Sequence, residues 1–259
     1  MGKQPGRCIF CDGFGMSKEH LFADWLRQLF PRSSNDTHTV GEAQHNTPYQ
    51  LTREQGHSGS KKARVVCEKC NNGWISELDN AAKAVAIPLI RGENILVTPE
   101  RQITMATWLT KMTMVGDSRK RRGYISKEER TAFMTLRQPP NLWEIWLSTY
   151  EGTDYRDLAL FQNGANLNAA KLTAVSGQVV PIGYLQTTTF GMGKTLGLVV
   201  GNDMSNLSFS VGTLSQRARR IWPLSNAFQW PLPSVLNDED AYAVTRIVDA
   251  MRMNFRKTP

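Results

Sequence analysis

Long apolar runs are missing from this sequence of 259 residues. No segment comes near the roughly 18 consecutive apolar residues that a membrane-spanning helix requires. The first residues, 1–7, include basic side chains but no apolar stretch, which argues against a secretory signal. Internal repeats are also missing, which argues against a repeat array. We therefore expect a cytoplasmic protein with no membrane partner.

Acidic residues are the scarcer of the two charged classes, with 23 Asp and Glu against 31 Lys and Arg. The resulting net charge of +8 favours an anionic partner, of which a nucleic-acid duplex is the most common. The hydrophobic fraction of 41% and the charged fraction of 21% are typical of a soluble globular protein. The length exceeds that of a typical single domain and favours either two domains or one domain with a large extension.

No cysteine is left over once the four are grouped as two CxxC pairs, Cys8 with Cys11 and Cys67 with Cys70. A reducing cytosol makes metal binding more probable for such pairs than disulfides. Four thiolates suit one tetrahedral Zn²⁺ with Zn–S distances of about 2.3 Å, and a site closed in this way is structural. Two thioredoxin-like redox pairs are the alternative, but neither pair lies in a βαβ pattern.

A phosphate-binding loop is also missing, although Gly193-Lys194-Thr195 resembles the end of one. The first glycine of G-x-x-x-x-G-K-T would fall at Thr188, and the flanking residues are typical of a hairpin turn.

The spacing of apolar residues predicts the secondary structure of the N-terminal part of the chain. After Ser17 it predicts an amphipathic helix that ends at Pro31, with Glu19 and His20 at its start. Residues 32–62 are polar and form a long inserted loop, within which short strands stay possible. A short strand at 64–66 leads into the second CxxC pair, and a second helix follows from Trp74.

A composition shift near Gly92 predicts a domain boundary, giving domains at 1–91 and 92–259. The second part is expected to be an α+β domain with an antiparallel sheet and flanking helices. Its helices are predicted near 103–112, 126–137 and 238–255, and the second of them begins with the capping pattern Ser126-x-x-Glu129. Its strands are predicted at 143–150, 157–161, 171–175, 184–190, 195–200 and 207–211.

The order of these motifs resembles the zinc-stapled HNH endonucleases. The resemblance rests on the two CxxC pairs, on Glu19-His20 between them, and on Asn71 directly after the second pair. It covers roughly residues 8–86 and implies a ββα-metal fold for the N-terminal module. The overall expectation is thus an α+β protein whose N-terminal HNH module contains a structural zinc.

The resemblance also implies roles for individual residues. His20 matches the general base that activates water, and a neutral imidazole suits that task at cellular pH. Asn71 matches a ligand of a catalytic divalent cation, Mg²⁺ or Mn²⁺, and Glu19 matches an acidic residue that shares this cation. Glu19 could reach the site of His20 only through a bend, because adjacent residues of a strand point to opposite faces.

Simpler readings of these residues stay open. Ser17 can act as an N-cap with Glu19 in the first helical turn, and Asn71 can cap the following helix. The asparagine that orients the family's histidine has no clear counterpart, and Asn46 is the only candidate.

Basic side chains form two clusters that suit contacts to a phosphate backbone. The first adjoins the second CxxC pair and the second follows a predicted helix. Their members are Lys61, Lys62 and Arg64, and Arg119, Lys120, Arg121 and Arg122.

The sequence therefore predicts an HNH-type endonuclease that hydrolyses phosphodiester bonds in DNA, with RNA not excluded. The alternative is a catalytically inactive zinc-stapled module that binds nucleic acid or protein. A homodimer and a subunit of a larger defence or mobile-element complex are both compatible with either function.

Overall fold

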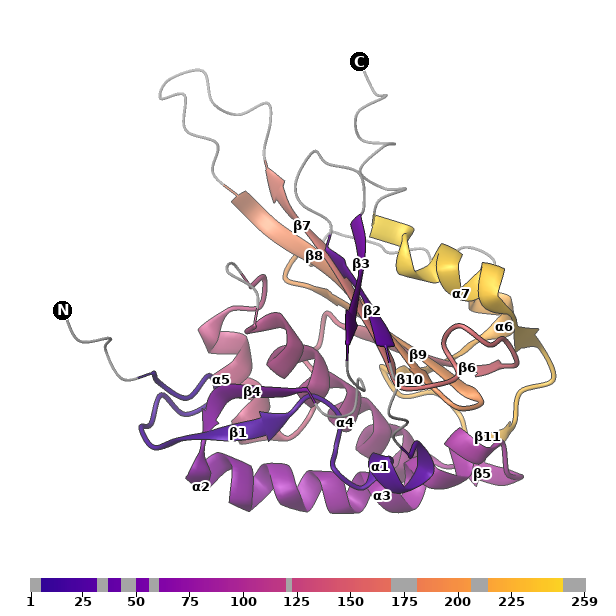
Figure 1. Ribbon diagram of the computed structural model, residues 1–259, viewed down its shortest axis with the longest axis horizontal. Helices are drawn as coiled ribbons and strands as arrows, with labels where there is room; N and C mark the ends of the chain where they lie inside the picture. Colours follow the sequence, from indigo (N-terminus) through magenta and orange to yellow (C-terminus); the bar gives the residue numbers. More distant parts are fainter. Residues whose placement is uncertain are drawn as a thin grey trace.

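The structure is a computed structural model that describes residues 6–31, 37–42, 50–55, 61–119, 123–168, 181–205 and 214–248. Helices and strands mix along the chain (Figure 1), so the prediction of a mixed α and β protein is confirmed. A small hairpin lies over a long helix on one side of the molecule, and a larger twisted sheet lies beside them.

The N-terminal part is a strand pair followed by a helix. Strand β1 (Met16–His20) pairs antiparallel with β4 (Lys62–Cys67). The chain then turns directly into helical segments: α2 (Glu68–Cys70), the π-helical η2 (Asn71–Ile75) and α3 (Ser76–Arg91). Helix α3 ends at Gly92, whose φ of 70° lies in the left-handed region that glycine enters without a steric penalty. We call β1, β4, α2, η2 and α3 the hairpin–helix unit.

The predicted amphipathic helix after Ser17 is wrong over its first half. Residues Met16–His20 form β1, and the only helix there is the short α1 (Leu26–Leu29). The competing interaction is the ladder with β4, in which Ser17 lies opposite Val66 and His20 opposite Lys62. This pairing satisfies the backbone groups that a helix would have satisfied internally.

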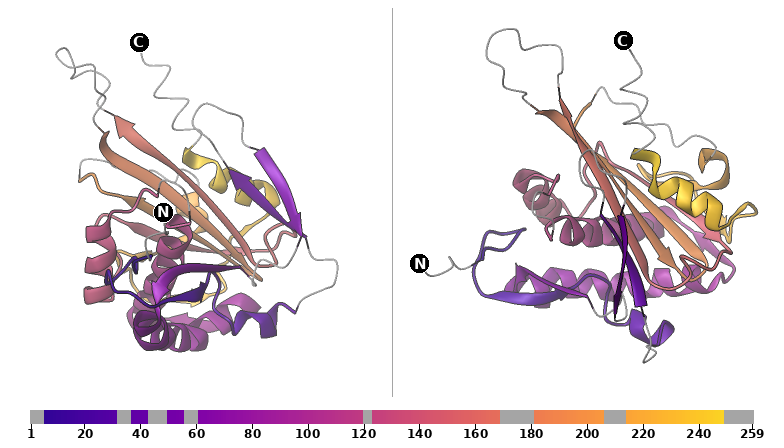
Figure 2. Two further views of the ribbon diagram at one scale, coloured as in Figure 1. Left: turned by 60° about the vertical axis from the view of Figure 1, so that its left-hand side comes forward. Right: turned by 45° about the horizontal axis from the view of Figure 1, so that its top comes forward.

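The described part of the predicted 32–62 loop is itself a hairpin. Strands β2 (Thr37–Glu42) and β3 (Gln50–Gln55) pair antiparallel, and β2 lies against β7 of the large sheet. Figure 2 shows this inserted hairpin standing away from β1 and β4. The candidate orienting residue, Asn46, lies outside the described residues.

The large sheet has six strands in the order β10-β6-β9-β8-β7, with β12 paired to β6. All pairs are antiparallel except β12 with β6. Its strands are β6 (Glu144–Tyr150), β7 (Ala159–Asn168), β8 (Pro181–Met192), β9 (Thr195–Asn202), β10 (Arg219–Trp222) and β12 (Val235–Leu236). A separate two-stranded pair joins β5 (Ile95–Val97) to β11 (Phe228–Trp230). The predicted strands at 171–175 and 207–211 lie outside the described residues.

Helices cover both faces of this sheet (Figure 2). The long α4 (Pro99–Asp117) packs on one face and α7 (Asp238–Thr245) on the other. The remaining helices are α5 (Lys127–Leu136) and α6 (Leu214–Arg217). The predicted capping box of Ser126 and Glu129 at the start of α5 is confirmed, since each side chain meets the backbone N–H of the other residue.

One hydrophobic cluster runs across the predicted boundary at residues 91 and 92. It contains Phe10 from the turn before β1 and Trp74 from the hairpin–helix unit, together with Trp108, Phe133 and Trp230 from later elements. The two sides therefore pack against each other directly, and the division at 91 and 92 stays a prediction about how the chain is organised.

Candidate metal centre and nucleic-acid interface

The four cysteines converge at one end of the hairpin–helix unit. Cys8 and Cys11 lie in a turn before β1, Cys67 ends β4, and Cys70 ends α2. Their Sγ atoms all lie within 4.8 Å of one another, and those of Cys11 and Cys67 are 3.5 Å apart. A tetrahedral zinc with Zn–S bonds of about 2.3 Å sets sulfurs roughly 3.8 Å apart, so the four thiols fit a structural metal such as zinc.

Backbone hydrogen bonds hold the first cysteine turn against β4. The N–H of Cys8 donates to the carbonyl of Gly13 at 2.9 Å, and the N–H of Ile9 donates to the carbonyl of Val65 at 3.0 Å. Gly13 also donates its N–H to Cys11 Sγ at 3.4 Å. The turn thus gains its place from β4 before any metal binds.

Burial and neighbouring donors act on the thiols in opposite directions. Burial raises the pKa of Cys11 and of Cys70. Burial also disfavours the Cys67 thiolate, but the backbone N–H of Cys70 and the neighbouring thiols lower the pKa of Cys67 overall. The guanidinium of Arg137 lies 4.3 Å from the ring of Trp74, next to the cluster. A positive charge there is favourable beside thiolates that bind a metal.

His20 ends β1 on the solvent side of the hairpin, with its side chain 21% exposed. Arg27 donates a hydrogen bond to His20 Nε2 at 2.6 Å, and Asp24 Oδ1 lies 3.2 Å from the same nitrogen. Arg27 also forms an ion pair with Asp24. A guanidinium only donates, so the Arg27 contact needs the neutral tautomer with a free Nε2 lone pair and its proton on Nδ1, whereas the Asp24 carboxylate suits a ring protonated at Nε2.

The surroundings of His20 favour this neutral form. Burial lowers the pKa of His20, the charge of Lys62 lowers it further, and Asp24 opposes both. The imidazole therefore accepts a proton less readily than a free histidine but stays in its basic form over a wider pH range.

Glu19 has entirely different surroundings from His20. Its side chain points into the protein, where its carboxylate pairs with Lys111 of α4 at 3.1 Å. Burial raises the pKa of Glu19, although Lys111 opposes that shift. The alternation of faces along β1 thus separates the two neighbours that the sequence assigned to one site.

Asn71 lies at the start of η2 and joins the helix to β1. Its Nδ2 donates to Ser17 Oγ at 2.9 Å, and Ser17 Oγ donates to the Val66 carbonyl at 3.3 Å. This arrangement fixes the amide and leaves its Oδ1 as the atom that could accept a ligand.

The predicted cation ligands therefore differ in what they can offer. Asn71 retains a carbonyl oxygen, whereas the Glu19 carboxylate is already neutralised by an ammonium group. Mg²⁺ in proteins usually binds through one or two carboxylates together with phosphate oxygens and water. The described residues do not fit a divalent cation shared by Glu19 and Asn71.

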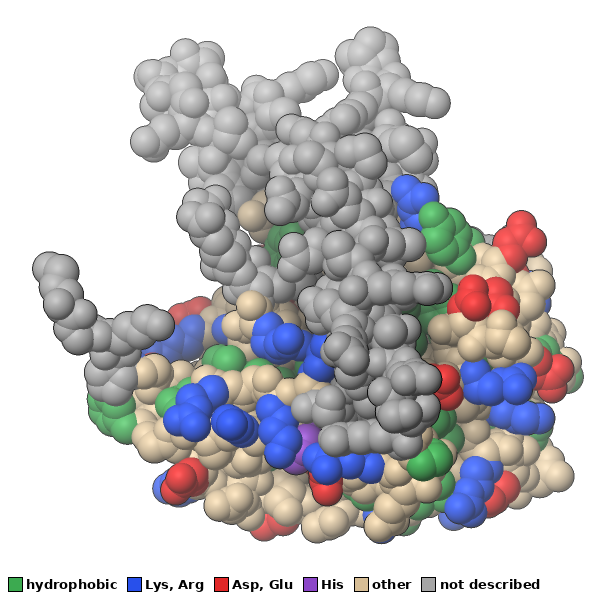
Figure 3. Space-filling model, in the orientation of Figure 1, with side chains coloured by type: hydrophobic (Ala, Val, Ile, Leu, Met, Phe, Trp, Pro, Cys, Tyr) green, Lys and Arg blue, Asp and Glu red, His purple; other side chains and the backbone are tan. Residues whose placement is uncertain are grey.

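Basic side chains lie around His20 on the outer face of the hairpin. Lys18, Lys62 and Arg64 are exposed, and Lys62 lies directly opposite His20 in the ladder. Figure 3 shows this side of the molecule, with Lys and Arg side chains gathered on both sides of a histidine. Lys61 begins this stretch and is partly exposed. We call Lys18, Lys62, Arg64 and Arg27 the basic face.

The second predicted basic cluster is described only at Arg119, which is exposed just after α4. Lys120, Arg121 and Arg122 lie outside the described residues. Their contact with nucleic acid stays a prediction.

Sequence reasoning missed four residues around the site: Asp24, Arg27, Asp79 and Lys111. Asp24 and Arg27 follow His20 at i+4 and i+7, but they reach it through a turn and not along the continuous helix that the sequence predicted. Lys111 carried a usable signal, since it is the only charged residue between Arg101 and Asp117. A lone charge in such a run is seldom buried unless it is paired.

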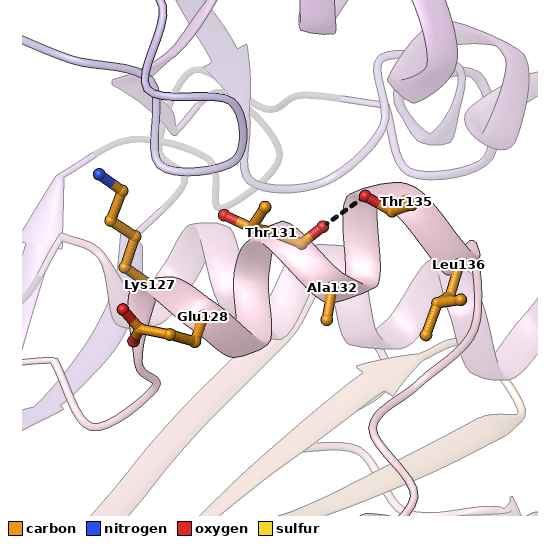
Figure 4. A pocket seen from close by; sticks show the side chains of 6 residues that line it. All are labelled: Lys127, Glu128, Thr131, Ala132, Thr135 and Leu136. Carbon is orange, nitrogen blue, oxygen red and sulfur yellow. Dashed lines mark hydrogen bonds between the residues drawn. The ribbon is translucent and has the colours of Figure 1, made fainter.

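A shallow pocket lies elsewhere, on the outer side of α5 (Figure 4). It is lined by Lys127, Glu128, Thr131, Ala132, Thr135 and Leu136, and Thr135 Oγ1 donates to the Thr131 carbonyl at 3.0 Å within it. All of these residues come from one helix, and the pocket brings together no catalytic group.

In the described part of the chain, every helix is too short or too polar to cross a membrane. No protein-family model, curated protein or solved structure matches the chain.

Proposed function

We propose that this protein is an HNH-type endonuclease that hydrolyses phosphodiester bonds in DNA, with His20 as the general base. The observation that carries the proposal is a partly exposed histidine, with its pKa lowered by burial, that lies among exposed cations on the outer face of a hairpin with a four-cysteine cluster. A strand pair followed by a helix is the arrangement that the sequence resemblance implies for such a nuclease.

His20 Nε2 is the atom that would take a proton from the attacking water. In the free protein Arg27 donates to this nitrogen. A phosphate group is a stronger acceptor for a guanidinium than imidazole is, because it is charged and can accept two parallel bonds. Substrate binding would therefore draw Arg27 onto the phosphate and free Nε2 for the water.

The exposed cations of the basic face would hold the nucleic-acid backbone. Lys62 and Arg64 project outward from β4, on the same side as His20. Contacts of this kind fix the position of a duplex without reading its sequence. They suit DNA and RNA alike, and either a dimer or a larger complex would be compatible with them.

A catalytic Mg²⁺ or Mn²⁺ would supply charge neutralisation at the phosphate. The Asn71 Oδ1 atom is the protein group left to bind it, together with phosphate oxygens and water. The steps assigned to His20, Arg27 and Lys62 involve this chain's own side chains.

The test is nicking of supercoiled plasmid DNA by the zinc-loaded full chain. His20→Ala should lower the rate by about 10² to 10⁴-fold, the usual contribution of a general base. Zinc content and melting temperature should not change. Thr135→Ala, which alters an exposed residue of α5, is the matched control. Undiminished cutting by His20→Ala would contradict the proposal.

The second candidate function is a zinc-stapled nucleic-acid-binding module without catalysis. The pairing of Glu19 with Lys111 favours it, because a carboxylate expected at the catalytic ion is occupied. This candidate predicts binding that weakens steeply with salt and no nicking in EDTA, Mg²⁺ or Mn²⁺. Fluorescence anisotropy beside the nicking assay separates the two.

A further inference from the structure

Three charged side chains from three separate elements meet beneath the hairpin. They are Glu19 of β1, Asp79 of α3 and Lys111 of α4. Lys111 Nζ lies 3.1 Å from Glu19 Oε1 and 2.9 Å from Asp79 Oδ1. The side chains of Lys111, Glu19 and Asp79 are 0%, 4% and 19% exposed, so the ammonium is out of contact with solvent.

Two tryptophans enclose the acidic end of this group. Trp108 Nε1 donates to Asp79 Oδ1 at 2.9 Å, and Trp25 Nε1 donates to the Asp79 carbonyl at 3.2 Å. Their rings stack with centroids 5.6 Å apart. Asp79 Oδ1 therefore accepts from both an indole and an ammonium, and the position of its carboxylate is well determined.

The ammonium of Lys111 is the only cation in contact with the two carboxylates among the described residues. Burial alone would lower the pKa of Lys111, but Asp79 and Glu19 together raise it, so the side chain stays protonated. Two carboxylates around one ammonium retain a net charge of −1. The same pair of oxygens around a divalent ion would retain none.

A purely stabilising role explains this arrangement poorly. Buried ion pairs cost several kcal/mol of desolvation per ion, and apolar residues of similar size often replace them without loss. What the triad does is fix Glu19, and through it the end of β1. His20 is the next residue of β1 and ends that strand.

We propose that Lys111 takes the place of a divalent cation beneath the hairpin: its ammonium fills the position between Glu19 and Asp79, excludes Mg²⁺ and Mn²⁺ from it, and positions the strand that bears His20. The inference deepens the proposed function and rests on it for the role of His20. Its own test measures ion binding and does not need activity. Lys111 is a positioning residue here, since its described contacts are with Glu19 and Asp79.

The geometry also predicts what removal of the ammonium would do. Mg²⁺ and Mn²⁺ bind oxygens at about 2.0 to 2.2 Å, roughly 1 Å closer than the two carboxylates lie to Nζ. Small side-chain movements would bring both oxygens into that range once the ammonium group is removed and a side chain of similar size is kept. Lys111→Met makes this change, because methionine is similar in length and uncharged.

The experiment is a titration with Mn²⁺ followed by electron paramagnetic resonance, on zinc-loaded protein in metal-free buffer. Wild type and Glu19→Gln should bind Mn²⁺ equally. Lys111→Met should gain about one Mn²⁺ site per chain, and the double variant Lys111→Met with Glu19→Gln should lose it again. Lys83→Met, which neutralises a partly buried lysine of α3, should behave as wild type.

Two outcomes would overturn the inference: a Mn²⁺ site in wild type that Glu19→Gln removes, or a folded Lys111→Met variant that gains no site. If Lys111→Met does not fold in metal-free buffer, added Mn²⁺ should restore its melting transition, and failure to do so counts against the inference. If the protein does not nick plasmid DNA but the Mn²⁺ titrations give the expected results, the proposed nuclease activity is refuted and the proposed role of Lys111 stands.

Discussion

The hairpin–helix unit and the large sheet are built by different means. The first has a two-stranded ladder, and its interior is held by four thiols at one end and a buried ion triad beneath β1. The second buries aliphatic and aromatic side chains on both faces of six strands. A two-stranded ladder cannot bury enough surface to be stable alone, so the first region relies on the hydrophobic cluster that it shares with later elements, and a metal at its four thiols would add a cross-link.

Removal of the metal should give the largest difference in stability between the two regions. Cys70→Ser should lose the zinc and unfold the hairpin–helix unit, because structural zinc contributes about 10 kcal/mol or more in zinc-finger peptides. Hydrogen-exchange mass spectrometry should then show lost protection in 61–91 and retained protection in β8 and β9. Elemental analysis gives the zinc content.

Lys69→Ala is the control for this change, since Lys69 is exposed between the two cysteines of the pair. Equal loss of protection in both regions of Cys70→Ser would show that the two fold as one cooperative unit and would remove the contrast.

The sheet should instead be sensitive to volume. A Cβ atom added at Gly191 of β8 would lie 2.1 Å from the backbone carbonyl oxygen of Tyr155, whereas one added at Gly197 of β9 would lie 3.4 Å from Leu109. We expect Gly191→Ala to destabilise the protein by about 1 to 3 kcal/mol, the usual cost of overpacking. Gly197→Ala should cost much less. Urea unfolding measures the stability of both variants. Equal midpoints would show that the sheet can accommodate a methyl group at Gly191.

The smallest expected effect concerns a carboxylate near α7. Asp238 accepts hydrogen bonds from the hydroxyl of Tyr150 and from the backbone N–H groups of Thr153 and Asp154. The Tyr150 bond is the main cause that lowers the pKa of Asp238 to about 2. Because the folded pKa is depressed, the unfolded chain binds more protons, and this stabilisation is present above about pH 4 and is lost as the pH falls towards 2.

Asp238→Asn should therefore be less stable than wild type at pH 6, and the difference should shrink between about pH 4 and 2. The urea midpoints of the two proteins are compared at each pH, so that losses of stability common to both proteins cancel. Glu239→Gln changes an exposed neighbour and is the control. A difference that stays constant with pH would show that the carboxylate contributes through packing alone.

The sequence predicted elements well where one pattern had no competitor. The capping box at Ser126 and the long strands β8 and β9 are examples. It failed at 16–20, because the helix predicted from the apolar spacing that begins at Leu21 was extended back over a strand that pairs with residues far along the chain. Strands of two or three residues, such as β5 and β12, carry too short a pattern to be seen.

The candidate site also has some features that the sequence predicts and others that it does not. The convergence of the four cysteines was predictable, because CxxC spacing carries its own geometry. The partners of His20 and Glu19 were not, since Arg27 reaches Nε2 through a turn and Lys111 approaches Glu19 from a helix 92 residues away. Such contacts depend on tertiary packing, which no local pattern encodes.

The inserted hairpin of β2 and β3 has a consequence for how this chain can change in length. It lies between Cys11 and Cys67, inside the loop that a bound metal would close. The entropy of closing a flexible loop rises only with the logarithm of its length, by about 0.6 kcal/mol for each doubling. Residues can therefore be added or removed at the tip of this hairpin with little penalty at the thiols. The segment is a natural place for a new recognition element to be grafted.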